Sequence, residues 1–384
     1  MRYGAAESTE NARRTECISP MTENLAVSAL LTPLAIQLNS GATKPHLVEF
    51  RGVMTPQHLD GPELETAALT SEATAHDLGW MRRVTVRGED RFRWLSGMVT
   101  NTVSDLPERS GAWNLVLNAQ GRIQGDLTVW RDSEALEVEI AADQYEKLMA
   151  HLERFIIMDD VELVAHDAAA ETALGLTGPK ASDVLVRVGL PAPAELMTSL
   201  RCEWNGFDIV VRRTFGVLAS HFEIWTPLAG LTLLWRALST AGAHPVGVAS
   251  LEGFRIAEGI PVYGIDIAER DLPQETSQMR ALHFSKGCYL GQEIVERIRS
   301  RGSVHRHLRQ LELDGPVPEP GTELNLDGAA VGQITSAAEL PLASGIRRFA
   351  LAMIRSEAEA KNQALGYSAN AGTGTILAQP PALQ

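Results

Sequence analysis

The sequence contains little cysteine, and this limits the kinds of site that it can build. Its 384 residues include three cysteines that stand far apart, with no CxxC pair and no cysteine and histidine cluster at zinc spacing. A disulfide framework needs several paired cysteines, and a self-contained structural metal site needs clustered ligands. We therefore expect no disulfide and no metal site, and a reducing compartment, the cytoplasm, fits best.

Long apolar runs and positive charge are also scarce. No stretch of about 18 uncharged apolar residues occurs, so no membrane-spanning helix is expected. The formal net charge is −14, which argues against a broad nucleic-acid surface because phosphate binding needs a basic footprint. Charged residues make up 21% of the chain, a share typical of globular proteins, and the length suits two or three domains.

The beginning of the chain allows two interpretations. Arg13 and Arg14 precede an apolar stretch, as in an export signal, but Glu23 and Pro33 interrupt that pattern. Met21 is an alternative start, and residues before it would then be dispensable. We expect residues 1–45 to form a poorly ordered extension.

Two parts of the chain repeat one order of elements. Residues 84–99 have the pattern of a strand, a turn at Gly88 and a helix, and a hairpin follows over residues 113–130. Residues 174–190 again have the pattern of strand, glycine and helix, and their Gly178 lies ninety positions after Gly88. Further strands and a closing helix follow in each part. This similarity predicts two related modules.

The remaining patterns set the expected boundaries. Residues 62–77 have the composition of a helix. From Val304 onward, short strands alternate with Gly, Pro and Asp turns, which is typical of a small barrel. The predicted fold class is therefore α+β, with modules over residues 46–165 and 166–303 and a C-terminal β-barrel over residues 304–384.

Cys288 is the position with the most unusual surroundings. A lone cysteine is most often a small buried hydrophobe. Here Gly287 frees the backbone, the following YLGQEIVERI predicts a helix directly after the thiol, and Lys286 adds positive charge, all of which favour a thiolate. Such a thiol can be a nucleophile, a redox group or one ligand of a shared metal cluster, and the residues alone do not decide among them.

The octapeptide KGCYLGQE, residues 286–293, resembles the signature of the YgfZ-type folate-binding proteins. These belong with the glycine-cleavage T protein, an aminomethyltransferase, in one superfamily. The likeness extends over nearly the whole chain from residue 46 onward. Further segments resemble the family in the same order: residues 88–106, 117–130, 176–181, 255–267 and 272–275.

The resemblance implies a fold and a function. The fold would be a ring of three domains around a central channel that holds tetrahydrofolate. The function would be that of an accessory protein for iron–sulfur cluster assembly or repair, with folate and iron–sulfur client enzymes as partners, an indirect link to tRNA through its modification, and Cys288 as the catalytic thiol. Two alternatives stay open, a folate-dependent one-carbon (aminomethyl) transferase and a scaffold with a vestigial pocket.

The resemblance also implies which residues contact the folate. Asp126 stands where the methyltransferases carry an acid that orients the cofactor, and a carboxylate suits the paired N–H donors of a pterin edge. The alternative for Asp126 is a solvent-facing strand residue. Asn118, Arg255, Lys286 and Gln292 lie in the matching segments and complete the predicted cofactor contacts.

The sequence departs from the methyltransferases at three acids. Gly125 stands where those enzymes carry a second acid beside Asp126, and Ala219 stands where they carry the acid of a turn that meets the pteridine. Ala257 occupies a position that is often Glu in relatives, and Glu258 follows it. These losses argue against glycine-cleavage chemistry, and whether Glu258 substitutes for the missing acid stays open.

One local concentration of positive charge remains. The stretch RIRSRGSVHRHLR, residues 297–309, is rich in arginine within an acidic chain. It could receive a folate polyglutamate tail, a phosphate backbone or an acidic protein, or it could be a solvated face near a domain hinge. We interpret its His305 and His307 as surface residues, because the surrounding arginines repel a metal cation.

Overall fold

The structure is a computed structural model, and it describes residues 30–41, 44–133 and 135–383. Most of the predicted N-terminal extension lies outside these residues. Where the structure describes it, the prediction of poor order is wrong. Thr32 accepts a hydrogen bond from the Ala35 backbone N–H at 3.1 Å and caps helix α1 (Pro33–Asn39). Leu34 on this helix is fully buried in the core of the second module, so packing fixes the segment.

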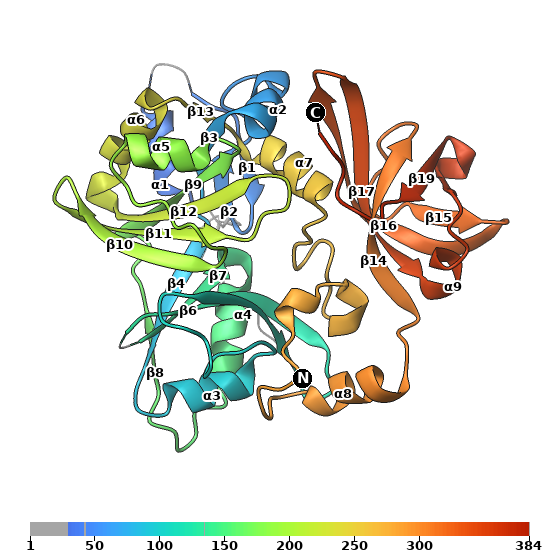
Figure 1. Cartoon of the computed structure of the whole chain (residues 1–384), viewed down its shortest axis with the longest axis horizontal. Helices are drawn as coiled ribbons and strands as arrows, with labels where there is room; N and C mark the ends of the chain where they lie inside the picture. The colour runs from blue at the N-terminus through green and yellow to red at the C-terminus, as the bar shows by residue number, and fades with distance from the viewer. Residues whose placement is uncertain (1–29, 42–43, 134, 384) are drawn as a thin grey trace, which may run out of the picture.

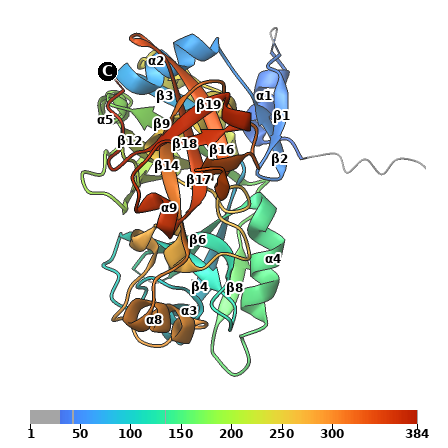
Figure 2. The ribbon, with the colours of Figure 1, turned by 90° about the vertical axis from the view of Figure 1, so that its right-hand side faces the viewer.

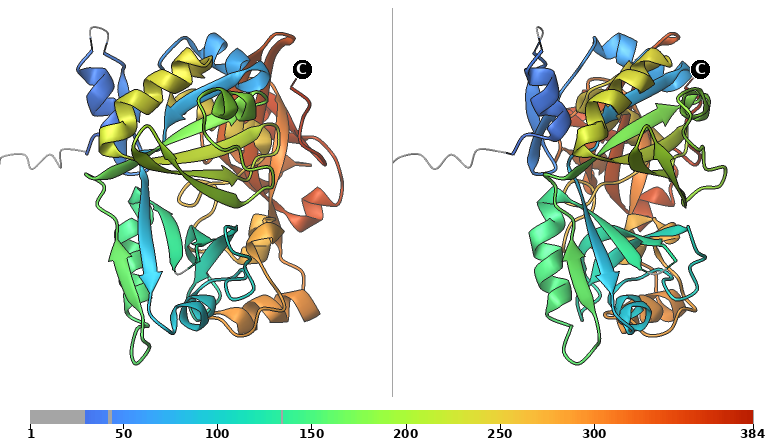
Figure 3. Two further views of the ribbon diagram at one scale, coloured as in Figure 1. Left: turned by 60° about the vertical axis from the view of Figure 1, so that its left-hand side comes forward. Right: turned by 90° about the vertical axis from the view of Figure 1, so that its left-hand side faces the viewer.

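The first module is a five-stranded antiparallel sheet with two helices. The strand order is β5-β6-β7-β4-β8, and its core includes Leu95 from α3 and Leu148 from α4. Figures 1 and 3 show α4 lying along this sheet. The elements are β4 (Met81–Arg87), α3 (Arg91–Met98), β5 (Gly111–Leu117), β6 (Ile123–Arg131), β7 (Leu136–Ala141), α4 (Ala142–Glu153) and β8 (Glu162–Ala165).

The second module contains a six-stranded sheet of order β10-β11-β12-β9-β3-β13. Apolar residues of α5 and α6, among them Leu185 and Leu234, pack into its core. The elements are β3 (Ala73–Asp77), β9 (Glu171–Gly178), α5 (Ala181–Arg187), β10 (Thr198–Trp204), β11 (Phe207–Thr214), β12 (Ser220–Pro227), α6 (Leu231–Thr240) and β13 (Ala243–Pro245).

The two sheets confirm the predicted repeat. The order β5-β6-β7-β4 in one matches β10-β11-β12-β9 in the other. In each module a glycine with positive φ ends the first strand, Gly88 at +100° and Gly178 at +133°. A Cβ atom there would lie 2.0 Å and 2.3 Å from a backbone carbonyl oxygen, so both turns require glycine.

One predicted element is wrong. The expected helix over residues 62–77 ends as α2 (Pro62–Ser71), and the next residues form β3. Every residue of β3 is buried, and the strand pairs with β9 and β13 in the second sheet. Pairing in the sheet thus outweighs weak helix propensity. As a result, the expected boundary at residue 165 does not separate the two sheets.

Buried ion pairs join the two modules. Arg212 on β11 binds Glu137 and Glu139 on β7. Arg83 on β4 binds Glu171 on β9. These charges are almost fully removed from water, so each depends on its partner in the other module.

The C-terminal part is a closed six-stranded barrel, as predicted. Its strands are β14 (Arg306–Asp314), β15 (Glu323–Leu326), β16 (Ala329–Leu342), β17 (Gly345–Arg355), β18 (Leu365–Tyr367) and β19 (Gly372–Ile376), with the short helix α9 (Ser356–Glu359) after β17. Figure 2 shows this barrel facing the viewer. The fold class of two related α+β modules with a small barrel is confirmed.

The remaining segments connect these three parts. A hairpin of β1 (Leu47–Phe50) and β2 (Val53–Pro56) and helix α7 (Val248–Glu258) contribute to the space between the modules. Helix α8 (Gln292–Arg301) lies beside α3 at the far end of the first module (Figures 1 and 2). None of the described helices is long and apolar enough to cross a lipid bilayer.

Candidate functional site

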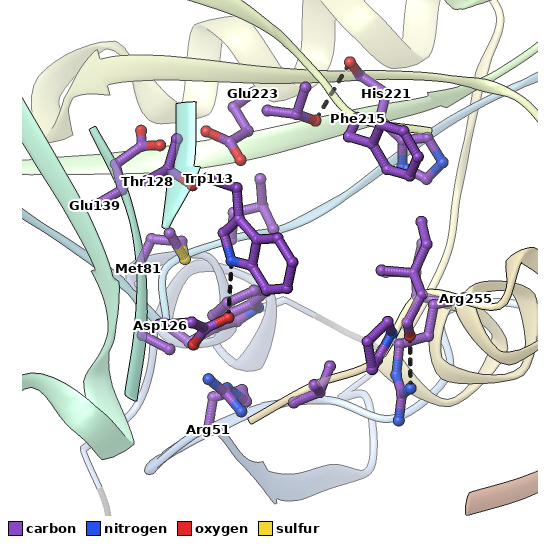
Figure 4. Close-up of a pocket in the computed structure, with 18 of the residues that line it drawn as sticks. Arg51, Met81, Trp113, Asp126, Thr128, Glu139, Phe215, His221, Glu223 and Arg255 are labelled. Carbon is purple, nitrogen blue, oxygen red and sulfur yellow. Dashed lines mark hydrogen bonds between the residues drawn. The ribbon is translucent and has the colours of Figure 1, made fainter. Parts of the chain in front are cut away.

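A cavity lies between the two modules, and residues of α7 line one side of it. Its volume of about 320 Å³ falls within the range of small-molecule pockets. Figure 4 shows Trp113 and Asp126 from the first module and Phe215 and His221 from the second around this space. The cavity therefore has aromatic walls and polar groups from both modules.

Asp126 is fixed on the first-module wall. Its Oδ2 accepts a hydrogen bond from Trp113 Nε1 at 3.0 Å, and its Oδ1 accepts one from Gln144 Nε2 at 2.7 Å. A Cβ atom on Gly125 would lie 2.7 Å from Gln144 Oε1, so this glycine makes room for the amide that holds Asp126. A carboxylate can accept about four hydrogen bonds, so Asp126 keeps acceptor capacity for a ligand.

The second-module wall contains a chain of hydrogen-bonding side chains. Glu258 Oε2 lies 2.9 Å from His221 Nε2, and Thr177 Oγ1 lies 3.3 Å from His221 Nδ1 and 3.1 Å from His76 Nε2. Burial and the nearby His221 lower the pKa of His76 to about 3, so His76 is neutral. The chain links α7 to three neighbouring strands of the second sheet, β12, β9 and β3.

Glu258 reaches the turn that contains Ala219, the position where the resemblance predicts the loss of an acid. Its Oε1 accepts hydrogen bonds from the backbone N–H groups of Val217 at 2.9 Å and Leu218 at 2.8 Å. Burial raises the pKa of Glu258, but His221 and these N–H groups outweigh it and lower the pKa below its ordinary value. Glu258 therefore puts a negative charge beside this turn, and its contact with a cofactor stays a prediction.

Two further carboxyl groups lie on the cavity wall, Glu139 and Glu223. Glu139 binds Arg212 and accepts hydrogen bonds from the indoles of Trp130 at 2.5 Å and Trp225 at 2.8 Å. Burial, together with the charge of Glu139, raises the pKa of Glu223 well above its usual range. This shift favours the protonated form of Glu223, in which the carboxyl group can donate as well as accept a hydrogen bond.

Arg255 lines the cavity, but its guanidinium is already bound. Its Nη1 donates to Asp266 Oδ2 at 2.7 Å and to the Ile260 carbonyl at 3.0 Å, and its Nε donates to Glu252 at 2.9 Å. Burial lowers the pKa of Arg255, but these two carboxylates outweigh burial and raise it. Arg255 thus positions α7, and direct binding of a cofactor stays a prediction.

The other predicted contacts lie away from the cavity. Asn118 Oδ1 accepts from the backbone N–H groups of Gln120 and Arg122 and closes the predicted hairpin. Gln292 Oε1 accepts from the backbone N–H of Tyr289 at 3.3 Å. These contacts account for both side chains within the fold, and their cofactor-binding role stays a prediction.

Lys286 is turned into the protein instead of toward a ligand. Its Nζ donates to the carbonyl oxygens of Ser96 and Val99, each at 2.6 Å, at the end of α3. Burial lowers the pKa of Lys286 to about 7. The structure thus places this amine in the contact between the KGCYLGQE motif and the first module.

Cys288 is exposed and lies outside the cavity. The expectation of a helix directly after the thiol is wrong, because α8 begins at Gln292, after the left-handed Gly291. Among the described residues, no group of His, Cys, Asp and Glu could hold a metal ion. The thiol is accessible to a partner, but a ligand inside the cavity does not meet it.

The part of the arginine-rich stretch that lies on β14 is paired with acidic residues. Arg306 binds Asp271 at 2.7 Å, and Arg309 binds Glu359 at 2.6 Å. His307 Nδ1 lies 2.7 Å from the same Glu359. These residues therefore attach the first barrel strand to its neighbours, and the charge that they carry is compensated locally.

The protein shares its fold with a class of known structures. The glycine cleavage system aminomethyltransferase T from Bartonella henselae superposes with a TM-score of 0.81 at 20% identity, over 91% of this chain and 97% of that one. At this identity the match shows the shared fold alone. The protein thus has the aminomethyltransferase T fold.

The family follows from the sequence comparisons. Residues 41–286 match the GCVT N-terminal domain, and residues 305–382 match the family described as CAF17, C-terminal beta-barrel domain. The aminomethyltransferase of Rubrobacter xylanophilus is 30% identical over 82% of this chain and 84% of that protein. That of Geobacillus kaustophilus is 26% identical over 82% and 87%. The chain belongs to the GCVT family, and its barrel places it with the YgfZ-type members, as the resemblance predicted.

Proposed function

We propose that the protein binds tetrahydrofolate in the cavity between its modules and serves iron–sulfur cluster assembly or repair in the cytoplasm. Its clients would include iron–sulfur enzymes that modify tRNA. The observation that carries the proposal is the joint presence of an Asp126-lined cavity in a GCVT-type body and a CAF17-type barrel. Aminomethyltransferases alone would account for the body but not for this barrel type.

The cavity chemistry supports a reduced pterin as ligand. Phe50 and Trp80 on the cavity wall offer aromatic surface to a planar ring, and Asp126 offers an acceptor for its N–H donors. On the other wall, the neutral Glu223 can donate to a ring carbonyl, and Glu258 adds a second acceptor. When bound, the folate would supply a site for one-carbon or electron chemistry, and the side chains named here would bind and orient it.

The binding step is tested by titrating tetrahydrofolate under anaerobic conditions into wild type, Asp126→Ala and Asp126→Asn. Loss of the acceptor should weaken binding by about tenfold or more, because an unpaired buried N–H of the ligand costs roughly 1–3 kcal/mol. The asparagine variant keeps one carbonyl acceptor and should lie between the two. Equal affinity in all three proteins would contradict the assignment of Asp126.

The accessory role is tested separately from binding. We propose that the exposed Cys288 acts at the contact with a client enzyme, as a thiol nucleophile, redox group or transient cluster ligand. In cells that lack the native protein, Cys288→Ala should restore less activity of an iron–sulfur client than wild type. Full rescue by this variant would remove the thiol from the proposal and leave folate binding untouched.

A second function, folate-dependent aminomethyl transfer, has its own support. The relatives reported above are named aminomethyltransferases, and one of them is 30% identical over most of its length. Glu258 beside the acid-deficient turn gives the cavity a carboxylate in the region of Ala219. Folate-dependent turnover of an aminomethyl donor by the purified protein would favour this function. Saturable binding without turnover would favour the accessory role.

A further inference from the structure

Arg280 occupies an unusual position at the cavity. It lies in a short 3-10 helix, Met279–Ala281, just before the KGCYLGQE motif. Its guanidinium carbon lies 4.3 Å from the ring centre of Trp113 in the first module and 3.9 Å from that of Phe215 in the second. The guanidinium thus contacts one aromatic ring from each module, and the residue lines the cavity.

The two terminal nitrogens of this guanidinium have no partner among the described residues. Arg280 Nε donates to Gln278 Oε1 at 3.0 Å, but among the described residues no hydrogen bond or ion pair reaches either terminal nitrogen. The two other arginines that line the cavity each hold a carboxylate. These pairs are Arg51 with Asp143 and Arg255 with Asp266.

The absence of a partner has an energetic consequence. A largely desolvated cation costs free energy unless an anion or hydrogen bonds compensate it. Burial lowers the pKa of Arg280 to about 10, while the more distant Asp126 and Glu258 raise it in part. The group is therefore still a cation at neutral pH. Contact with the two aromatic rings stabilises the cation but supplies no acceptor for its terminal N–H groups.

A guanidinium held in this way is suited to one class of group. Its two terminal N–H groups match the two oxygens of a carboxylate in a planar, two-bond arrangement. Asp126 and Glu258 carry the opposite charge and therefore select N–H donors elsewhere on the ligand. The cavity thus combines acceptors for one part of a ligand with a single unpaired cation for another.

We propose that Arg280 binds a carboxylate of the cavity ligand and selects for ligands that carry one. The inference rests on the proposed function, in which the carboxylate is that of the glutamate moiety of the folate. Arg280 then determines specificity for the glutamate-bearing form, while Asp126 binds the ring. Contact with the rings of Trp113 and Phe215 holds the guanidinium of Arg280 in place.

The experiment compares two ligands in three proteins. The ligands are 5-formyltetrahydrofolate, which carries a glutamate, and a tetrahydropterin without the benzoylglutamate part. The proteins are wild type, Arg280→Gln and Arg280→Lys, and affinities are measured by calorimetry. Arg280→Gln should lose about tenfold or more in affinity for the glutamate-bearing ligand and less than about twofold for the tetrahydropterin. Arg280→Lys keeps the positive charge but lacks the planar pair of N–H groups. Its affinity for the glutamate-bearing ligand should lie between those of wild type and Arg280→Gln.

A matched control separates the effect from general loss of an arginine. Arg131 also stacks on an aromatic ring, with its guanidinium carbon 4.8 Å from the centre of Phe92, but it lies outside this cavity. Arg131→Gln should leave both affinities unchanged. If Arg280→Gln fails to fold, Arg280→Lys alone must still show the selective loss.

The outcomes distinguish the two proposals. If wild type binds neither ligand, the proposed folate function fails. If wild type binds both and the Arg280 variants weaken both equally or neither, folate binding stands and the carboxylate role of Arg280 is wrong. If the Arg280 variants melt at a lower temperature and lose equal affinity for both ligands, Arg280 is a purely structural contact between the modules.

Discussion

Glu223 is the residue whose protonation state matters most for the cavity wall. Burial and the negative charge of Glu139 raise its pKa well above the ordinary value of 4.5. A carboxyl group with a raised pKa in the folded state destabilises the fold above its ordinary pKa, because the unfolded chain loses the proton more readily. The folded state therefore loses stability as the pH rises from 4.5 towards the raised value.

Replacing Glu223 with glutamine should remove this loss. Glu223→Gln has nearly the same shape and carries no charge at any pH. We expect it to unfold at the same temperature as wild type near pH 4 and at a higher temperature at pH 7. The gain should be roughly 2–4 °C for each kcal/mol relieved. Thermal unfolding followed by circular dichroism at both pH values measures it, and equal melting temperatures at pH 7 would contradict a neutral Glu223.

At the residue scale, sequence predicted part of the cavity. Asp126 and Arg255 were predicted, and both line it. Arg280, His221 and Glu223 were missed. Their roles arise from partners that lie far away in the chain, such as Trp113 and Phe215 around Arg280. No local motif predicts that these residues line the cavity, because their sequence neighbours form no pattern that indicates a site.

The strand-to-helix turns are the clearest feature at the scale of elements. In the first module Asp90 N–H donates to the Asp160 carbonyl at 3.2 Å, and in the second Lys180 N–H donates to the Glu72 carbonyl at 3.1 Å. The glycine before each donor lets the backbone approach that same carbonyl. The repeat therefore includes the hydrogen bond that anchors each turn as well as the order of strands.

A side chain at these turns should be strongly destabilising. Gly178→Ala would place a Cβ atom 2.3 Å from the Glu72 carbonyl oxygen at a φ of +133°. We expect a loss on the order of 3 kcal/mol in the free energy of unfolding, measured by urea denaturation. Gly189→Ala is the control, since its φ is also positive, at +79°, but open space surrounds it, and the loss there should be about 1 kcal/mol. Similar losses in both variants would show that the close contact is unimportant.

Elements with strong local patterns were predicted best. The hairpin over residues 113–130 forms as β5 and β6, because alternating apolar residues flank turn residues. The predicted helix over residues 62–77 is wrong in its last part, where residues 73–77 form β3. The segment ATAHD has no clear period, and β3 exists because its backbone pairs with strands more than ninety residues later in the chain.

At the scale of the whole molecule, the sequence predicted three parts but not the contacts that hold them together. The change of sequence pattern at Val304 to short strands separated by turn residues predicted the barrel, since short strands and turns are local features. The modules themselves are interleaved, because β3 precedes the first sheet in the chain and pairs in the second. Besides an apolar cluster that includes Phe254 and Phe349, contacts between the parts involve single polar side chains whose partners lie far away in the chain, such as Asp266.

Asp266 joins the barrel to the body at a buried point. Its Oδ2 accepts from Arg255 Nη1 at 2.7 Å, and its Oδ1 accepts from the hydroxyl groups of Thr335 and Ser336 on β16 at 2.6 Å each. Because Arg255 lines the cavity, this carboxylate connects the ligand site to the barrel. Removing it leaves the Ser336 hydroxyl and the Val262 backbone N–H without this acceptor in a place that water hardly reaches. It also breaks the ion pair with Arg255, although Arg255 Nη1 keeps the Ile260 carbonyl as acceptor.

We therefore expect Asp266→Ala to loosen the barrel from the modules. The cost should be about 3 kcal/mol, the scale of a broken buried ion pair, and urea unfolding together with limited proteolysis between body and barrel measures it. Asp327→Ala is the matched control, because its ion pair with Lys361 at 2.9 Å is exposed and should contribute less than about 1 kcal/mol. If Asp266→Ala matches this control in both measurements, the other contacts between barrel and modules, such as the ion pair of Arg306 with Asp271, hold the barrel without Asp266. A stable but protease-sensitive variant with weaker ligand binding would instead show that the barrel supports the cavity through Arg255.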